Sequence, residues 1–74
     1  MSVQREPKLL DSVAVTNAAP NSDVSVGDVG TIVELLQPDG LEVEFLDRDG
    51  RTRCVATLNV RDILVLNRER TKVA

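Results

Sequence analysis

The chain of 74 residues contains no histidine, no tryptophan and no tyrosine, and it has one cysteine and one phenylalanine. Histidine is the commonest general base in enzymes, so neither a Ser-His-Asp nor a Cys-His arrangement can be assembled from this composition. A zinc site needs several cysteine or histidine ligands, which are missing as well. We therefore predict that the protein is not an enzyme, holds no metal or cofactor, and has no small-molecule substrate.

Membrane and export segments are also missing from the sequence. The longest uninterrupted apolar run is Ile63 to Leu66, whereas a membrane-spanning helix needs about 20 residues. The first ten residues carry charges at Arg5, Glu6 and Lys8 and lack the apolar centre of a signal peptide. The lone Cys54 excludes an intrachain disulfide and fits a reducing compartment. We therefore expect a cytoplasmic protein.

Charge divides the chain into three segments. Residues 11–66 hold ten acidic and four basic side chains, a net charge of −6, whereas residues 1–10 and 67–74 carry +1 and +2. We expect one folded domain over 11–66, flanked by a flexible N-terminal segment, 1–10, and a flexible C-terminal tail, 67–74. An acidic body repels phosphate backbones, so nucleic acid is an unlikely partner.

The first part of the domain is predicted to be a strand followed by a long loop. Asp11 to Thr16 alternates apolar and polar residues with the period of a half-buried strand. The segment 17–28 is rich in turn-forming residues and contains one short extended piece, Val24 to Val26. It is the longest irregular segment, and loops often carry binding residues.

A first hairpin is predicted around Pro38 to Gly40, where Pro-Asp-Gly supplies the residues of a three-residue turn. In the preceding strand, the face that includes Val33 and Leu35 is then predicted to point into the core. The predicted cross-strand pairs are Gln37 with Leu41, Leu35 with Val43, and Val33 with Phe45.

A second hairpin is predicted at Asp49-Gly50, taken as a two-residue turn that needs positive φ. The predicted cross-strand pairs are Phe45 with Cys54, Val43 with Ala56, and Leu41 with Leu58. Both turns bring apolar residues to one face, which predicts a three-stranded antiparallel meander.

The chain then predicts one helical turn and a last strand. Asn59 is suited to cap a turn over 59–62 that tucks Val60 inward, and Ile63 to Leu66 forms the final strand. Five short strands with a long first loop, two tight hairpins and a turn before the last strand is the order of an SH3-like small barrel. The predicted fold class is therefore all-β, a five-stranded SH3-like small barrel.

Four stretches of the sequence carry a family resemblance. "LLDSVAVT", "VGDVGTIVE", "PDGLEVEFLDRDGRT" and "VATLNVRDILVL" resemble a small bacterial and cyanobacterial family catalogued as a domain of unknown function, over about 9–66. The resemblance implies an SH3-like barrel and brings no assigned activity, cofactor or catalytic residue. Members encoded beside toxin-like or other partner proteins imply an accessory or antitoxin-like role.

A looser similarity is to KOW-type modules, which bind nucleic acid. In those modules a Gly-Asp pair enters a loop and a Gly-x-Val step opens the next strand, a pattern that Gly27, Asp28, Gly30, Ile32 and Val33 fit loosely. The basic and aromatic residues that would read RNA are missing here. Nucleic-acid binding is therefore kept as the alternative function.

The outward face of the meander is the candidate interaction surface. In the predicted register Ile32 lies opposite Leu46, and with Leu36 these residues form an apolar patch rimmed by charge. Glu34 falls opposite Glu44, a like-charge pair that calls for a nearby base. The alternative is that a strongly bent second strand turns Ile32 or Leu36 into the core.

Four further residues complete the predicted interaction site. Arg51 and Arg53 suit a partner's carboxylates, although pairing with the chain's own acids is the simpler explanation. Asp23 and Val24 are the predicted partner-binding residues of the long loop. The leading hypothesis is a non-enzymatic protein-interaction module, or an accessory subunit, with a protein partner or a second copy of itself.

Two other motifs have a structural and a functional interpretation. Cys54 is a reactive thiol if exposed beside arginines, but its register turns it inward as a small buried residue. The Asp47 to Gly50 segment superficially resembles a calcium loop but lacks the further ligands of an EF-hand. Its aspartates more simply hold the hairpin turn by hydrogen bonds to the backbone.

Overall fold

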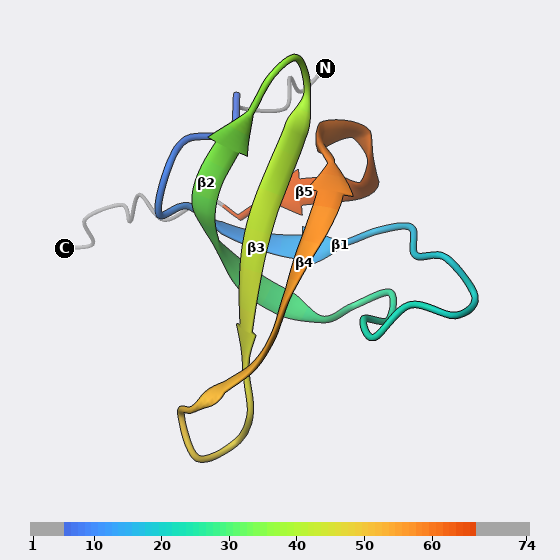
Figure 1. Ribbon diagram of the computed structural model, residues 1–74, viewed down its shortest axis with the longest axis vertical. Coiled ribbons are helices and arrows are strands. Elements are labelled where there is room, and N and C mark those ends of the chain that lie inside the picture. Colours follow the sequence, from blue (N-terminus) through green and yellow to red (C-terminus); the bar gives the residue numbers. More distant parts are fainter. Residues whose placement is uncertain (1–5, 67–74) are drawn as a thin grey trace, which may run out of the picture.

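The computed structural model describes residues 6–66 as an antiparallel sheet of five strands (Figure 1). The strands are β1 (Ser12–Val15), β2 (Val29–Leu36), β3 (Gly40–Leu46), β4 (Thr52–Asn59) and β5 (Ile63–Val65), and a 3-10 turn, η1 (Val60–Asp62), precedes the last strand. The predicted all-β class, the strand count and the helical turn are confirmed. Residues 1–5 and the predicted tail, 67–74, lie outside the described residues.

The sheet curls like a small barrel but does not close. Its strand order is β4-β3-β2-β1-β5, so β4 and β5 are the two edges. Strand β2 is shared, because its first residues pair with β1 and the residues from Thr31 onward pair with β3. In Figure 1 β1 and β5 therefore run across β3 and β4, and the interior lies between these two layers.

The core is aliphatic around one aromatic ring. Phe45 is 1% exposed and is the largest fully buried side chain. The buried hydrophobic residues are Val13, Val15, Val24, Ile32, Leu41, Val43, Phe45 and Ile63. Gly30 faces this core, since a Cβ built on it would lie 2.7 Å from the Glu44 carbonyl oxygen and 2.8 Å from the Phe45 ring. Only a residue without a side chain fits where β2 passes so close to β3.

The predicted register of the first hairpin is wrong. The structure pairs Leu36 with Gly40 and Leu35 with Leu41, so the loop is 37–39 and Gly40 already belongs to β3. A register shift between Ile32 and Glu34 then moves Ile32 opposite Val43 and turns it inward. Such a bulge adds a residue to one strand and reverses the faces that a regular alternation predicts.

The predicted register of the second hairpin is confirmed in all three pairs, although its turn is different. The Asp47 carbonyl accepts a hydrogen bond from Gly50 N–H at 3.0 Å, and Asp47 N–H donates to the Arg51 carbonyl at 2.8 Å. The loop therefore has three residues, 48–50, with Gly50 at a φ of +85°. A register shift between Phe45 and Leu46 compensates for the added residue and leaves Arg53 as the extra residue of a bulge in β4.

The turn before β5 forms as predicted. Asn59 is its N-cap and accepts a hydrogen bond from Arg61 N–H at 2.9 Å through its side-chain Oδ1. Val60 packs against the core. At the predicted extended piece, Val24 and Ser25 have no regular secondary structure and Val26 begins a turn. No helix in the described part of the chain is long and apolar enough to cross a membrane.

Candidate functional site

The free edge of β4 is the most distinctive surface of the described chain. Pairs of an antiparallel ladder alternate between those that exchange backbone hydrogen bonds and those that do not. Val60 N–H donates to the Asp39 carbonyl at 3.0 Å, which makes Leu58, Ala56 and Cys54 the bonded positions of β4. The intervening residues, Val55 and Thr57, direct their backbone N–H and C=O groups away from β3.

Within residues 6–66 these outward groups have no backbone partner. Strand β4 is the first strand of the sheet order, and no backbone hydrogen bond between residues 6 and 66 joins its outer edge to another segment. An eight-residue edge strand without a partner is long, and such edges are where another chain can add a strand.

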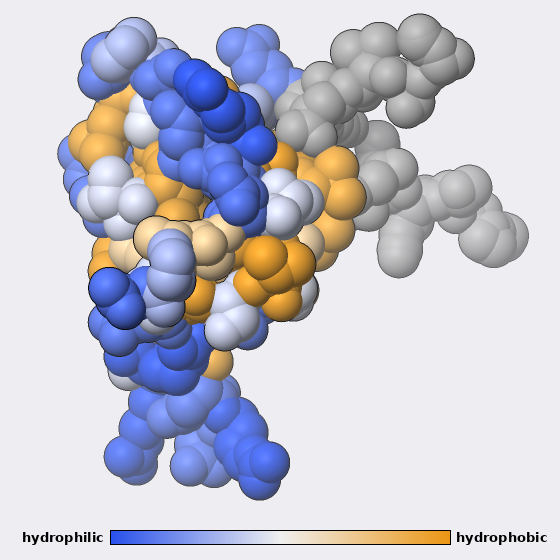
Figure 2. All heavy atoms as spheres, turned by 90° about the vertical axis from the view of Figure 1, so that its right-hand side faces the viewer, coloured by the Kyte–Doolittle hydropathy of each residue, from blue (hydrophilic) through white to orange (hydrophobic). Residues whose placement is uncertain are grey.

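A groove runs beside this edge. It has a volume of about 740 Å³ and separates the C-terminal half of β4 from the β1–β2 loop. The residues that line it are Asn17, Ala18, Ala19, Pro20, Ser22, Gly40, Thr57, Leu58, Asn59 and Asp62. Seen from the side of this loop, the tip of the second hairpin is hydrophilic and hydrophobic surface is exposed in the middle of the molecule (Figure 2). The groove thus offers small and polar side chains beside an open backbone edge.

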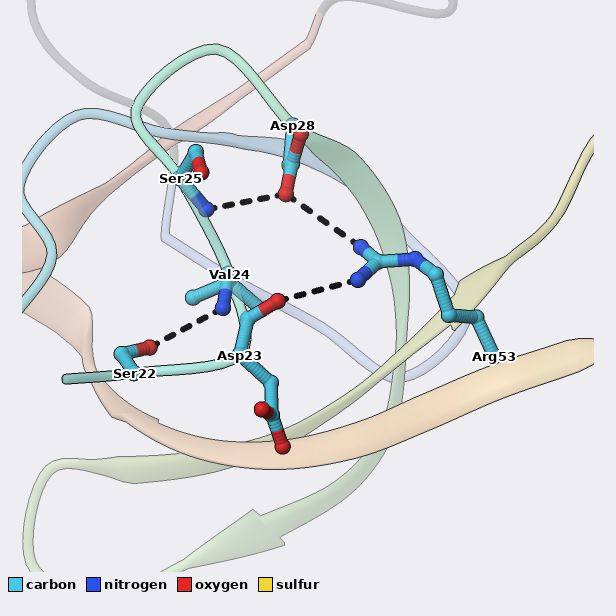
Figure 3. Close-up of polar contacts among 6 residues, drawn as sticks. All are labelled: Ser22, Asp23, Val24, Ser25, Asp28 and Arg53. Atoms are coloured by element: carbon cyan, nitrogen blue, oxygen red, sulfur yellow. Dashed lines mark hydrogen bonds and ion pairs between the residues drawn. The ribbon is translucent and has the colours of Figure 1, made fainter.

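The wall of the groove opposite β4 is the β1–β2 loop, which β4 itself holds in place (Figure 3). The Arg53 guanidinium donates to the Asp23 carbonyl oxygen at 2.9 Å and to Asp28 Oδ2 at 3.2 Å. Its carbon lies 5.7 Å from the centroid of the Phe45 ring, within cation–π range. Arg53 is the bulged residue of β4, so the bulge turns its side chain toward the loop.

Hydrogen bonds within the loop complete this arrangement. The Ser22 hydroxyl accepts from Val24 N–H at 3.0 Å, and Asp28 Oδ2 also accepts from Ser25 N–H at 2.9 Å. Val24 is buried against the core, whereas the Asp23 carboxylate points away from the guanidinium in Figure 3. The loop is therefore anchored at its centre rather than free.

The outward face of β3 carries carboxylates that lean toward β4. The Thr57 hydroxyl donates to Glu42 Oε2 at 2.8 Å, and the Thr52 hydroxyl donates to Glu44. Glu34 lies opposite Glu42, not opposite Glu44 as predicted. Among residues 6–66 the ion pair between side chains is Arg53 with Asp28, so none of the three glutamates is paired with a base there.

The structure does not assemble the predicted apolar patch. Ile32 and Val24 are both buried, so neither lies on a surface that a partner could contact. Leu36 is half-buried and lines a small cavity of about 170 Å³ at the first hairpin. Leu46 is 53% exposed but lies beside the second hairpin, at the opposite end of β3. The bulge in β2 is the physical reason that Ile32 turns inward, whereas Leu36 and Leu46 are separated because they lie at opposite ends of the β2–β3 ladder.

The remaining predicted residues lie on the surface. Arg51 and Asp23 are exposed, and Arg53 is exposed but engaged with the loop. Cys54 is half-buried opposite Phe45, on the inward face that its register predicted. Sequence reasoning did not single out the β4 edge, because an edge depends on the strand order and not on any local motif.

The Asp47 carboxylate has a structural role in the second hairpin. Its Oδ1 accepts from Asp49 N–H at 2.9 Å and from Arg51 N–H at 3.0 Å, which is the turn geometry predicted for this aspartate. No group of three or more cysteine, aspartate or glutamate side chains in the described range 6–66 is arranged to hold a metal ion.

Comparison with known proteins identifies the family. Residues 9–65 match the family described as Domain of unknown function (DUF4926), which covers most of the chain, so the protein belongs to this family. No curated protein and no solved structure matches the chain.

Proposed function

We propose that this member of the family is a non-enzymatic, cytoplasmic protein-interaction module. It binds an extended segment of a partner protein as an additional strand along the free edge of β4. The observation that carries the proposal is this edge, whose Val55 and Thr57 backbone groups point outward and whose C-terminal half lines a groove of about 740 Å³. Strand addition uses main-chain hydrogen bonds for affinity and the neighbouring pockets for specificity.

The composition favours this role over catalysis. Histidine is absent from the whole sequence, and the groove is lined by amide, hydroxyl and small aliphatic side chains with Asp62 as its one titratable residue. Such groups hydrogen-bond and pack against a ligand but supply no pair of acid and base. The acidic body also disfavours nucleic acid, and Arg53 is already engaged with Asp28.

The test is a selection of extended peptides from a randomised display library, with the full chain as bait. Selected peptides should shift the NMR amide signals of Val55, Thr57 and the β1–β2 loop. The substitution Thr57→Pro removes an outward N–H that only an added strand uses, and proline is tolerated on an edge strand. It should weaken binding by about tenfold, as expected when one backbone hydrogen bond is lost and the ring obstructs the ladder.

Thr57→Val is the matched control. It keeps the backbone N–H and the strand propensity but removes the hydroxyl that donates to Glu42. Because it keeps the backbone group that strand addition uses, this variant should bind more tightly than Thr57→Pro. If Thr57→Pro, checked for native folding by its NMR spectrum, bound selected peptides as tightly as the unmodified chain, strand addition at β4 would be refuted.

A further inference from the structure

We infer that the partner segment carries lysine or arginine at two alternate positions, with an aliphatic residue between them. This inference rests on the proposed function and specifies the chemistry of its ligand. It follows from how two carboxylates are held beside the β4 edge.

Glu42 and Glu44 are positioned by hydroxyl groups of the edge strand itself. Glu42 accepts from Thr57, at 2.8 Å, and Glu44 accepts from Thr52. Both side chains therefore lie over β4, between β3 and the position that an added strand would take. Val55, which pairs with Glu44, presents a 52% exposed aliphatic side chain on the same face.

The spacing of Glu42 and Glu44 along β3 suggests the spacing of the ligand's bases. Residues two apart in a strand point to the same face with their Cα atoms about 6.8 Å apart, and this holds for Glu42 and Glu44 as well as for alternate residues of an added strand. The added strand would lie about 4.8 Å from β4. A lysine or arginine stem spans that distance, so two alternate bases reach the two carboxylates.

Charge on the surrounding elements supports the same occupant. Glu34 adds a third carboxylate across from Glu42 on β2, and the outward positions of β4 next to the edge are Thr52, Val55 and Thr57, all uncharged. The residue between the two bases would face the other side of the sheet, toward the groove that Ala18 and Leu58 line. An aliphatic residue suits that position.

The test uses two synthetic peptides, Thr-Val-Lys-Val-Lys-Val-Thr and its counterpart with glutamine in place of both lysines, titrated into the full chain. We expect the lysine peptide to bind about tenfold more tightly at about 20 mM salt, the size expected for two cross-strand ion pairs. The difference should shrink several-fold at about 300 mM salt. The double substitution Glu42→Gln, Glu44→Gln should abolish the preference.

A control with the same change in net charge separates local from general electrostatics. Asp39→Asn with Asp49→Asn removes two acids at the two hairpin loops, away from the edge, and should keep at least half of the preference. Equal binding of the two peptides would overturn the inference while leaving strand addition intact. If neither peptide shifted the Val55 and Thr57 signals, strand addition itself would lose its support.

Other occupants of the edge give different results before any peptide is added. If the chain's own terminal segment covered β4, the Val55 and Thr57 amides would be protected from hydrogen exchange at every protein concentration. If a second copy covered it, protection would rise with concentration. Either result would overturn the inference that a partner's basic segment is the ligand.

Discussion

Replacing Gly30 with alanine tests the path of β2 through the core. An added Cβ would lie 2.7 Å from the Glu44 carbonyl oxygen, 2.7 Å from Val43 Cγ1 and 2.8 Å from the Phe45 ring. Carbon atoms in proteins pack at about 3.5–4.0 Å. The methyl group therefore requires a backbone oxygen and a buried ring to move together.

The size of the effect follows from what must move. Overpacking of a well-filled core costs about 1–3 kcal/mol and occasionally more, and the backbone contact places Gly30→Ala near the upper end, at about 3 kcal/mol. A domain of this size has a total stability of roughly 4–11 kcal/mol. At about 4–8 °C per kcal/mol, the midpoint of thermal unfolding should fall by roughly 12–24 °C.

Urea and thermal denaturation followed by circular dichroism measure this loss. Gly40→Ala is the control, because its nearest contact is 3.3 Å, to the Leu36 Cβ, and it should cost less than about 1 kcal/mol. In the register predicted from sequence, Gly30 would share the outward face with Ile32, and alanine there would be harmless. A loss below about 1 kcal/mol for Gly30→Ala would therefore contradict the bulged β2.

Two further predictions address the core and the loop. Ile32→Asn should destabilise the protein by about 3 kcal/mol or more, because it places an amide in the core. Leu46→Asn, at an exposed position, should change stability by less than about 1 kcal/mol. Equal losses in urea titrations would contradict the assignment of Ile32 to the inward face and Leu46 to the outward face. Arg53→Ala should speed hydrogen exchange at the Ser25 amide several-fold while lowering global stability by less than about 1 kcal/mol, because the ion pair with Asp28 is exposed to solvent. An unchanged exchange rate would show that the loop does not depend on this arginine.

The register of β3 with β4 could be predicted from the sequence, whereas that of β2 with β3 could not. In β3 every inward residue is apolar and two of the three outward side chains are glutamates, so only one face can be buried. In β2 both faces carry aliphatic residues, such as Ile32 on one and Val33 on the other. Hydrophobic alternation then does not distinguish the faces, and a bulge leaves no local mark in the sequence. The residue that could have indicated the inward face of β2 was Gly30, because a glycine within a strand often marks a close approach of two backbones.

The candidate site was predicted only in its loop and in Arg53. That a long segment before β2 borders the site follows from its length and turn-forming composition. The edge that faces it depends on which strands end the sheet, and the outward direction of the Thr57 backbone depends on the hydrogen-bond phase of the β3–β4 ladder. Both are properties of long-range pairing that no short stretch of residues encodes.

Strand β4 connects the two halves of the site. Near its beginning, Arg53 leaves the ladder at the bulge and holds the β1–β2 loop at Asp23 and Asp28. Near its end, Thr57 and Asn59 line the groove whose other wall is that same loop. The width of the groove is thus set partly by a side chain that does not line it. Arg53 is therefore a positioning residue: its removal should weaken peptide binding by loosening the loop, without altering the preference for lysine that Glu42 and Glu44 confer.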